Sequence, residues 1–431
     1  MQIIAVSYNP FFERKNMNNF EKFSLSPSLN ASLKHMKYTN PTPIQVQAIP
    51  LALKGRDIMG SAQTGTGKTG AFSIPLVEAI LRSEDDCALV LTPTRELGKQ
   101  VMEVITQLLG PKSHINTAFI IGGESMGKQF SQLKRNPRIV VGTPGRINDH
   151  LERGSLKLDK TNFLVLDETD RMLDMGFSVQ IDRIVKHIPN ERQTLMFSAT
   201  LPKNIINLSS KYLNNPERIA VGSTIAPAKN IKRQVIHITN EGKYNELIRQ
   251  LDDRKGSVII FVKTKHGTER LAKRLRAADH SAEAIHGDLK QRRRDRVITE
   301  FRDKKYRILV ATDVAARGLD IPHIEHVVNY DLPQVPEDYI HRIGRTARAG
   351  AEGASLCFVS PEEGRKWYAI EMLINPDKKM EKPPADPSKK SRRKPNRGKV
   401  TNHRQGGKPS NNNTNGKKRN FAKKKTRKAA A

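Results

Sequence analysis

A glycine-rich stretch, AQTGTGKT at residues 62–69, has the composition and spacing of a phosphate-binding loop. It lies between a strand-like segment, DIMGS, and a helix-like segment, GAFSIPLVEAILR. A glycine-rich turn that opens a helix directs backbone N–H groups and the helix dipole at phosphates. In such a loop Lys68 reaches the β- and γ-phosphates and Thr69 binds Mg²⁺. An ordinary glycine turn is the alternative, but the flanking strand and helix favour a nucleotide site.

Three carboxylates follow another strand-like run, in the stretch LVLDETD at residues 164–170. A P-loop site needs an acid at the end of a neighbouring strand to hold its Mg²⁺, and Asp167 has that place. Glu168 comes one residue later and can face the attacking water. An acid after a strand is usually a helix cap or a first-turn charge, but here the P-loop favours the metal and water roles.

The elements that must position these groups alternate along the chain. Short β-rich runs, CALVLT to TLMFSAT and then VIHIT to ASLCFV, are separated by amphipathic stretches. This alternation predicts an α/β fold with doubly wound parallel sheets. Ligands of such sheets bind at the carboxyl ends of the strands, where the two motifs fall.

Charge and cysteine content narrow the class of protein. Lys and Arg number 75 against 44 acids, a net charge of +31, which indicates a polyanionic partner. Nucleic acid is favoured over membrane because no apolar run approaches the ~20 residues that span a bilayer. IIAVSY is too short for a signal peptide, and two cysteines, Cys87 and Cys357, argue against a disulfide framework. We expect a soluble cytoplasmic protein.

Composition shifts divide the chain into four parts. We predict an N-terminal domain at 1–221, a linker at 222–232 rich in turn residues, a C-terminal domain at 233–377 and a tail at 378–431. The tail holds 20 Lys/Arg and 2 acids with one aromatic residue, so it cannot bury a core and is predicted to be disordered. Such a tail is typical of a nonspecific RNA-binding arm, although a merely solubilising role is the alternative.

Further motifs resemble those of the DEAD-box ATP-dependent RNA helicases of superfamily two, over roughly residues 20–360. They occur in the family's order: PTPIQ with Gln45 and the upstream Phe20, then PTREL, Gly122-Gly123, TPGR, SAT, IIFVKTK, QRRR, ATDVAARGLD and HRIGRTARAG. The chain departs from the family at Ala62, where the loop usually has glycine, and at Thr169, where DEAD has alanine. The three carboxylates remain, so we expect ATP hydrolysis to be retained.

The resemblance implies two tandem RecA-like domains that bind ATP and Mg²⁺ between them. Five residues are implied as catalytic: Lys68, Asp167, Glu168, Arg345 and Arg348. Thr69 and Asp167 would hold the metal. The nucleotide would contact Phe20, Gln45, Ala62, Gln63, Thr64, Gly65, Thr66, Gly67, Lys68, Thr69 and Asp320. Hydrolysis would be coupled to domain closure by Asp170, Ser198, Thr200 and His341.

RNA is the implied partner, on a path across both domains. The implied contacts are Thr94, Arg95, Gly123, Thr143, Arg146, Thr264, Gln291, Arg294 and Thr312. Small residues and backbone donors suit phosphate and sugar contacts, which carry no base sequence information, and 2′-hydroxyl contacts would select RNA over DNA. We therefore expect structured or duplex RNA to be bound with little base specificity.

The cellular use is less determined by the motifs. MLDMGF and HGDLKQRRRDR resemble the bacterial RhlE-type subgroup, which implies ribosomal precursors or RNA-decay proteins as partners. An RNA clamp or annealing chaperone gated by ATP stays open as an alternative. A DNA translocase of the same superfamily is disfavoured by PTREL and the PTPIQ motif.

Overall fold

The computed structural model describes residues 20–375 and Lys378, except 64, 200–202, 222–229, 317, 320, 322, 348–350 and 376–377. The predicted basic tail, apart from Lys378, and most of the predicted linker therefore lie outside the described residues. Within the described part, no helix is both long enough and apolar enough to cross a membrane.

The first half of the chain forms a seven-stranded parallel sheet with the order β3-β4-β2-β5-β6-β1-β7. Its strands are β1 Ile58–Ala62, β2 Cys87–Leu91, β3 Thr117–Ile120, β4 Ile139–Gly142, β5 Thr161–Leu166, β6 Gln193–Ser198 and β7 Glu217–Val221. Its helices are η1 Phe20–Phe23, α1 Pro27–His35, α2 Pro43–Leu53, α3 Lys68–Arg82, α4 Arg95–Leu109, α5 Met126–Leu133, α6 Pro144–Glu152, α7 Thr169–Asp174, α8 Ser178–Val185 and α9 Lys203–Tyr212.

The second half forms a six-stranded parallel sheet with the order β10-β11-β9-β12-β13-β8. Its strands are β8 Ile231–His237, β9 Ser257–Phe261, β10 Ala282–Ile285, β11 Ile308–Ala311, β12 Ile324–Asn329 and β13 Gly353–Val359. Its helices are α10 Lys243–Asp253, α11 Lys265–Arg276, α12 Gln291–Arg302, α13 Asp313–Ala316, α14 Pro336–Ile343, η3 Pro361–Glu363 and α15 Gly364–Ile374.

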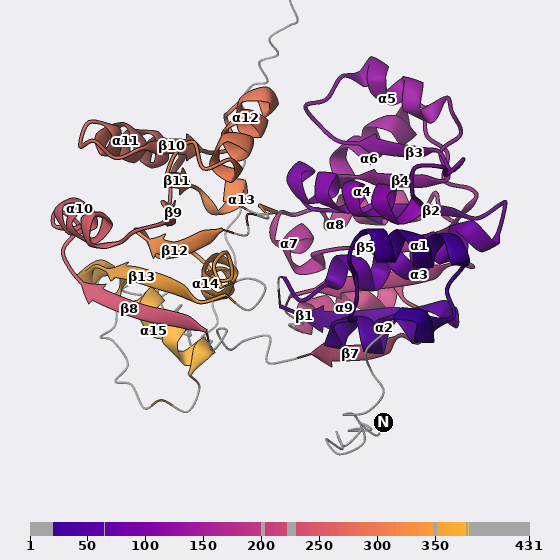
Figure 1. Ribbon diagram of the computed structural model, residues 1–431, viewed down its shortest axis with the longest axis horizontal. Helices are drawn as coiled ribbons and strands as arrows, with labels where there is room; N and C mark the ends of the chain where they lie inside the picture. The colour runs from indigo at the N-terminus through magenta and orange to yellow at the C-terminus, as the bar shows by residue number, and fades with distance from the viewer. Residues whose placement is uncertain are drawn as a thin grey trace, which may run out of the picture. The chain divides into compact units, whose positions relative to one another are not determined.

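Both faces of each sheet are buried, as the near-continuous apolar runs predict. Along β2, Ala88 and Val90 pack into one core with α1–α4, while Leu89 and Leu91 pack into a second core with α6 and α8. In the second sheet, Ile260 faces α10 and α11, whereas the adjacent Phe261 faces α12. Figure 1 shows helices against both sheets. The predicted doubly wound α/β fold is confirmed.

Three details differ from the sequence expectation. β7 and β10 were not expected as strands, because both are short and neither carries a strong apolar run. β8 begins at Ile231, inside the predicted linker. Its residues Lys232, Arg233 and Gln234 are exposed at the sheet edge, and the strand is defined by its seven-residue pairing with β13.

Candidate active site

The glycine-rich loop follows the carboxyl end of β1 and opens α3. Gly65 and Gly67 have φ angles of 83° and 93°, in the left-handed region that glycine adopts without strain. Gly67 is the N-cap of the 15-residue helix α3. Thr66 donates its hydroxyl to the Gln63 carbonyl at 2.6 Å, and Thr69 is half-buried in the first turn of α3. Thr64 lies outside the described residues.

Lys68 is buried at the start of α3, with its ammonium folded back over the loop. Nζ donates to the carbonyls of Ala62 at 2.6 Å and Gln63 at 3.1 Å. Burial lowers the pKa of Lys68, and the nearby Asp167 carboxylate opposes that shift. The loop therefore contains a cation whose present partners are neutral carbonyls, which a phosphate could replace with a charge-assisted contact.

The carboxylates of Asp167 and Glu168 lie just past β5 and are almost fully buried. The Glu168 N–H donates to Asp167 Oδ1 at 2.9 Å. Glu168 itself has φ 48° and ψ 51°, a left-handed conformation that is uncommon for a residue other than glycine. The Thr169 hydroxyl donates to the Leu166 carbonyl at 3.1 Å, so the group that replaces the family's alanine has a hydrogen-bond partner.

Burial raises the pKa of Asp167 to about 7, and the neighbouring Glu168 charge adds to the effect. The unfolded chain would lose this proton near pH 4. The native state thus holds a proton that the unfolded state releases between about pH 4 and 7, so the free energy of unfolding falls across that range. Above pH 7 the protein carries the full cost of an ionised buried carboxylate.

Asp167→Asn should therefore stabilise the protein without nucleotide at pH 8. We expect the free energy of unfolding to rise by about 1–3 kcal/mol, below the ~4 kcal/mol that separates a pKa of about 7 from one near 4, because Lys68 also loses the attraction of the Asp167 charge. The gain should shrink toward pH 5. Urea unfolding in EDTA at both pH values measures it, and a gain that is equal at the two pH values would contradict the cause assigned here.

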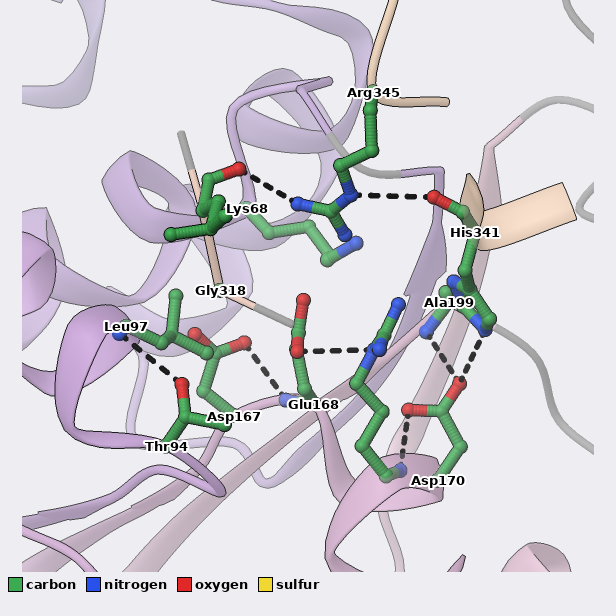
Figure 2. A network of polar contacts seen from close by, with 12 residues as sticks. Lys68, Thr94, Leu97, Asp167, Glu168, Asp170, Ala199, Gly318, His341 and Arg345 are labelled. Atoms are coloured by element: carbon green, nitrogen blue, oxygen red, sulfur yellow. Dashed lines mark hydrogen bonds and ion pairs between the residues drawn. The ribbon is translucent and has the colours of Figure 1, made fainter. Parts of the chain in front are cut away.

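Asp170, in the first turn of α7, connects three elements. Its Oδ1 accepts from the Arg171 N–H at 3.0 Å and its Oδ2 from the Ala199 N–H at 3.2 Å. His341 Nε2 of α14 lies 3.9 Å from Asp170 Oδ2, and Figure 2 shows these side chains around the carboxylate. Ser198 is buried at the end of β6. The predicted coupling residues Asp170 and His341 are thus brought together, and Ser198 directly precedes Ala199, whose N–H binds Asp170. Thr200 lies outside the described residues.

Arg345 is buried just after α14, and backbone carbonyls hold its guanidinium. Nε donates to the His341 carbonyl at 3.2 Å and Nη1 to the Leu319 carbonyl at 2.8 Å. Figure 2 draws Arg345 in one view with Lys68 and Glu168, and its dashed lines join the Arg345 guanidinium to backbone carbonyls. Arg348 and Asp320, predicted as the second arginine and the ribose contact, lie outside the described residues.

Gln45 connects α2 to the phosphate-binding loop. Its Oε1 accepts from the Thr42 N–H at 2.9 Å, and its Nε2 donates to the Gly67 carbonyl at 3.0 Å. One amide proton and one oxygen lone pair remain for a ligand. Phe20 is buried, with its ring centroid 5.8 Å from that of Phe23 and 6.0 Å from that of Tyr38.

Most of the predicted RNA contacts line one cavity of about 530 Å³. Six of the nine predicted residues lie in its wall: Thr94, Arg95, Thr143, Arg146, Gln291 and Arg294. Gly123, Thr264 and Thr312 do not. A Cβ on Gly123 would lie 2.3 Å from Arg95 Nη1, while Thr264 caps α11 and Thr312 precedes α13.

The sequence did not predict the side chains that form hydrogen bonds between the first and the second half of the chain. Arg294 donates from Nε and Nη2 to Glu96 Oε1 at 2.9 and 2.7 Å, and Arg95 donates to Gln291 Oε1 at 2.7 Å. Gln100 donates to the Gly318 carbonyl at 2.6 Å. Glu96 and Gly318 stand inside the PTREL and ATDVAARGLD motifs, so motif membership was the available signal; Gln100 carried none.

The described residues contain no cluster of three or more His, Cys, Asp or Glu side chains that could hold a metal ion alone. Thr69 and Asp167 would supply one hydroxyl and one carboxylate. Mg²⁺ commonly keeps several waters and binds through one or two carboxylates plus substrate phosphates. The donor set therefore fits a metal that arrives with a nucleotide.

Comparison with known proteins decides the family. The model of the DEAD/DEAH box helicase family matches residues 42–208, and that of the helicase conserved C-terminal domain matches residues 242–350. The DEAD-box ATP-dependent RNA helicase CshA of Geobacillus kaustophilus is 42% identical over 370 residues, which cover 85% of this chain and 79% of that protein. The chain belongs to the DEAD-box helicases. The helicase is also 46% identical over 354 residues to the ATP-dependent RNA helicase DeaD of Mycobacterium tuberculosis, covering 82% of this chain and 62% of DeaD.

Solved structures give the same assignment for the fold of the helicase. Saccharomyces cerevisiae Dbp5 bound to RNA and ADP BeF3 matches with a TM-score of 0.76 and 34% identity, over 84% of the helicase and 95% of that chain. Mss116p bound to single-stranded RNA and AMP-PNP matches with a TM-score of 0.74 and 29% identity, over 83% of the helicase and 77% of that chain. The two sheets are thus RecA-like domains, as the motifs implied.

Proposed function

We propose that this helicase hydrolyses ATP to remodel or locally unwind RNA duplexes. The observation that carries the proposal is the convergence of Lys68, Asp167 and Glu168 in one buried cluster beside a glycine loop that opens a helix. A cation, a metal-binding carboxylate and a second carboxylate for the water are the groups that phosphoryl transfer to water requires.

Each group has a proposed role. Lys68 would leave the Ala62 and Gln63 carbonyls to bind the β/γ-phosphates, and Thr69 with Asp167 would hold Mg²⁺, which neutralises charge on the phosphates. Glu168 would orient the water and accept its proton. Arg345, with Arg348, would stabilise the charge that develops on the transferring group. Asp170, Ser198, Thr200 and His341 would couple the two domains.

The contacts of the nucleotide and of RNA are proposed on the same basis. The bound ligands of Dbp5 and Mss116p, named above, support a nucleotide and RNA. The loop 62–69, Gln45, Phe20 and Asp320 would bind ATP, and the nine residues named for RNA would contact its backbone. We also propose the predicted domain bounds, with a linker near 222–232 and the tail as an RNA arm.

Pathway and subgroup stay proposals. Relatives named CshA and DeaD support a bacterial RNA helicase, and the RhlE-type subgroup stays a prediction. Partners among ribosomal precursors or RNA-decay proteins, and a cytoplasmic location, are expected on the same grounds.

ATPase assays with RNA, with DNA of the same sequence and without nucleic acid test the proposal, together with displacement of a short RNA strand. We expect stimulation by RNA only, and ATP-dependent displacement. Equal stimulation by DNA would indicate a DNA translocase. Stimulation by RNA with annealing but no displacement would indicate the clamp or chaperone.

Adenine recognition gives a prediction for the Gln45 contact. Gln45→Ala should weaken the binding of ATP more than the binding of GTP, because the Gln45 amide can pair with both a donor and an acceptor on adenine. Gly70→Ala should act in the same direction, since a Cβ there would lie 2.6 Å from Gln45 Nε2 and would displace the amide. We expect the preference for ATP over GTP to fall by ~5–10-fold, about the contribution of one hydrogen bond. Gly127→Ala is the matched control, because the nearest side-chain atom that a Cβ there would meet among the described residues is Ser125 Oγ at 3.8 Å. Equal losses for ATP and GTP would refute the adenine role.

The tail gives a second prediction. Deleting residues 378–431 should leave RNA-saturated ATPase intact, because all the proposed catalytic residues lie upstream. RNA affinity should fall most at low salt, and the slope of log affinity against log salt should become shallower by roughly 0.7 per phosphate contact removed. An unchanged slope would assign the tail to solubility or a protein partner.

A further inference from the structure

We propose that Arg171 is the positioning residue that holds the Glu168 carboxylate for catalysis. The inference rests on the proposed role of Glu168 and extends it to a side chain that no motif singled out. Arg171 lies on α7, three residues after Glu168, and it does not belong to the metal or phosphate ligands proposed above.

The contact is a buried ion pair. Arg171 Nε lies 3.1 Å from Glu168 Oε2, and the two side chains are only 3% and 7% exposed. Other arginine pairs of the same domain are far more exposed, for example Arg183 with Glu152 at 3.9 Å, 62% and 68% exposed. An exposed pair adds little because water screens it, whereas a buried pair restricts both partners strongly.

The backbone of Glu168 explains why such a restraint is needed. Its left-handed φ and ψ are strained for a residue with a Cβ. Three hydrogen bonds stabilise this turn: the Glu168 N–H donates to Asp167 Oδ1, and the N–H groups of Arg171 and Met172 donate to the Glu168 carbonyl at 3.0 and 3.1 Å. None of these bonds involves the Glu168 carboxylate. The ion pair with Arg171 acts on the carboxylate itself.

The Arg171 guanidinium also has a donor that no hydrogen bond within the described residues uses. Its Nη2 is buried and has no hydrogen-bond partner among the residues that the structure describes. Buried side-chain donors are normally satisfied. Arg171 also lines a small cavity together with His341 and Arg345 of the second domain, so it lies between the Glu168 carboxylate and the residues proposed to complete the site.

The test is a double-mutant cycle with the full chain. Arg171→Met, which removes the charge at similar length, should lower RNA-saturated kcat by ~10–100-fold, the scale of a misplaced general base. ATP and RNA dissociation constants should change less than about threefold. Arg171→Lys should recover part of the loss. In a Glu168→Gln background, measured by single turnover, Arg171→Met should cause no further loss. Arg183→Met is the matched control and should leave kcat unchanged.

Two outcomes would overturn the proposal. One is an equal fold-loss from Arg171→Met in both backgrounds, which would show that Arg171 acts independently of Glu168. The other is weakened ATP binding with unchanged kcat, which would make Arg171 a nucleotide-binding residue. Thermal midpoints are measured in parallel; if Arg171→Met does not fold, the comparison of Arg171→Lys in the two backgrounds decides in the same way. Failure of the proposed function is separate, since it would appear as RNA-independent turnover of the wild type or full activity of Glu168→Gln.

Discussion

Glu168→Gln should reduce RNA-saturated ATP turnover by about 10²–10⁴-fold, the range that a general base contributes. Glutamine has the same shape and keeps an oxygen beside Arg171, but its amide does not take a proton from water. Phosphate release at saturating RNA measures the loss. The dissociation constants for ATP and RNA should change little, because Lys68 and the proposed metal ligand Asp167 remain.

A matched control for this variant is Glu152→Gln, which changes an exposed carboxylate of the same domain. It should retain wild-type turnover. If Glu168→Gln keeps a kcat within threefold of the wild type, Glu168 does not activate the water, and the search for the base would turn to Asp170.

Arg345→Lys should lower kcat by about 10³-fold or more, as the loss of an arginine finger does. The Arg345 guanidinium already uses Nε and Nη1 on the His341 and Leu319 carbonyls. A planar fork can keep those contacts and still present donors to a phosphoryl group, whereas a lysine ammonium has a single charged centre and cannot do both. Single-turnover hydrolysis with ATP and RNA saturating is the measurement.

Because Arg345 is buried, the substitution could destabilise the fold, so the thermal midpoint of the Arg345→Lys protein is compared with that of the wild type. The control is Arg249→Lys, which alters an exposed, paired arginine of α10 in the same domain. A higher KM for ATP with an unchanged kcat would assign Arg345 to ground-state binding and would refute its role in the transition state.

The phosphate loop and the carboxylates could be predicted from the sequence because their chemistry is local. Lys68 and Thr69 follow the loop within one helical turn, and Asp167 and Glu168 follow one strand directly. In an α/β fold the carboxyl ends of parallel strands meet at one edge. Motifs that directly follow two strands are therefore predicted to lie at the same edge of the sheet, even though β1 and β5 are about a hundred residues apart in the chain.

Arg171 shows what local patterns leave out. Its spacing of three residues from Glu168 would suggest an ordinary helical ion pair, worth a few tenths of a kcal/mol on a surface. Only the packing around α7 removes water from both side chains and turns the pair into a strong restraint. The left-handed turn at Glu168 is equally invisible in the sequence, because glutamate has no preference for that conformation.

The amino-acid sequence by itself determined the two doubly wound parallel sheets, the glycine-rich loop with its lysine, and a net charge of +31 that favours a nucleic-acid partner. Apolar alternation, glycine spacing and charge are properties of neighbouring residues, so they can be recognised without the fold. Tertiary structure alone decided that Gln45 holds the Gly67 carbonyl, that Arg294 meets Glu96, and that the Asp167 carboxyl has a pKa near 7. These properties depend on desolvation and on contacts between residues 22 to 198 positions apart. Chain folding creates both, and no local pattern records them.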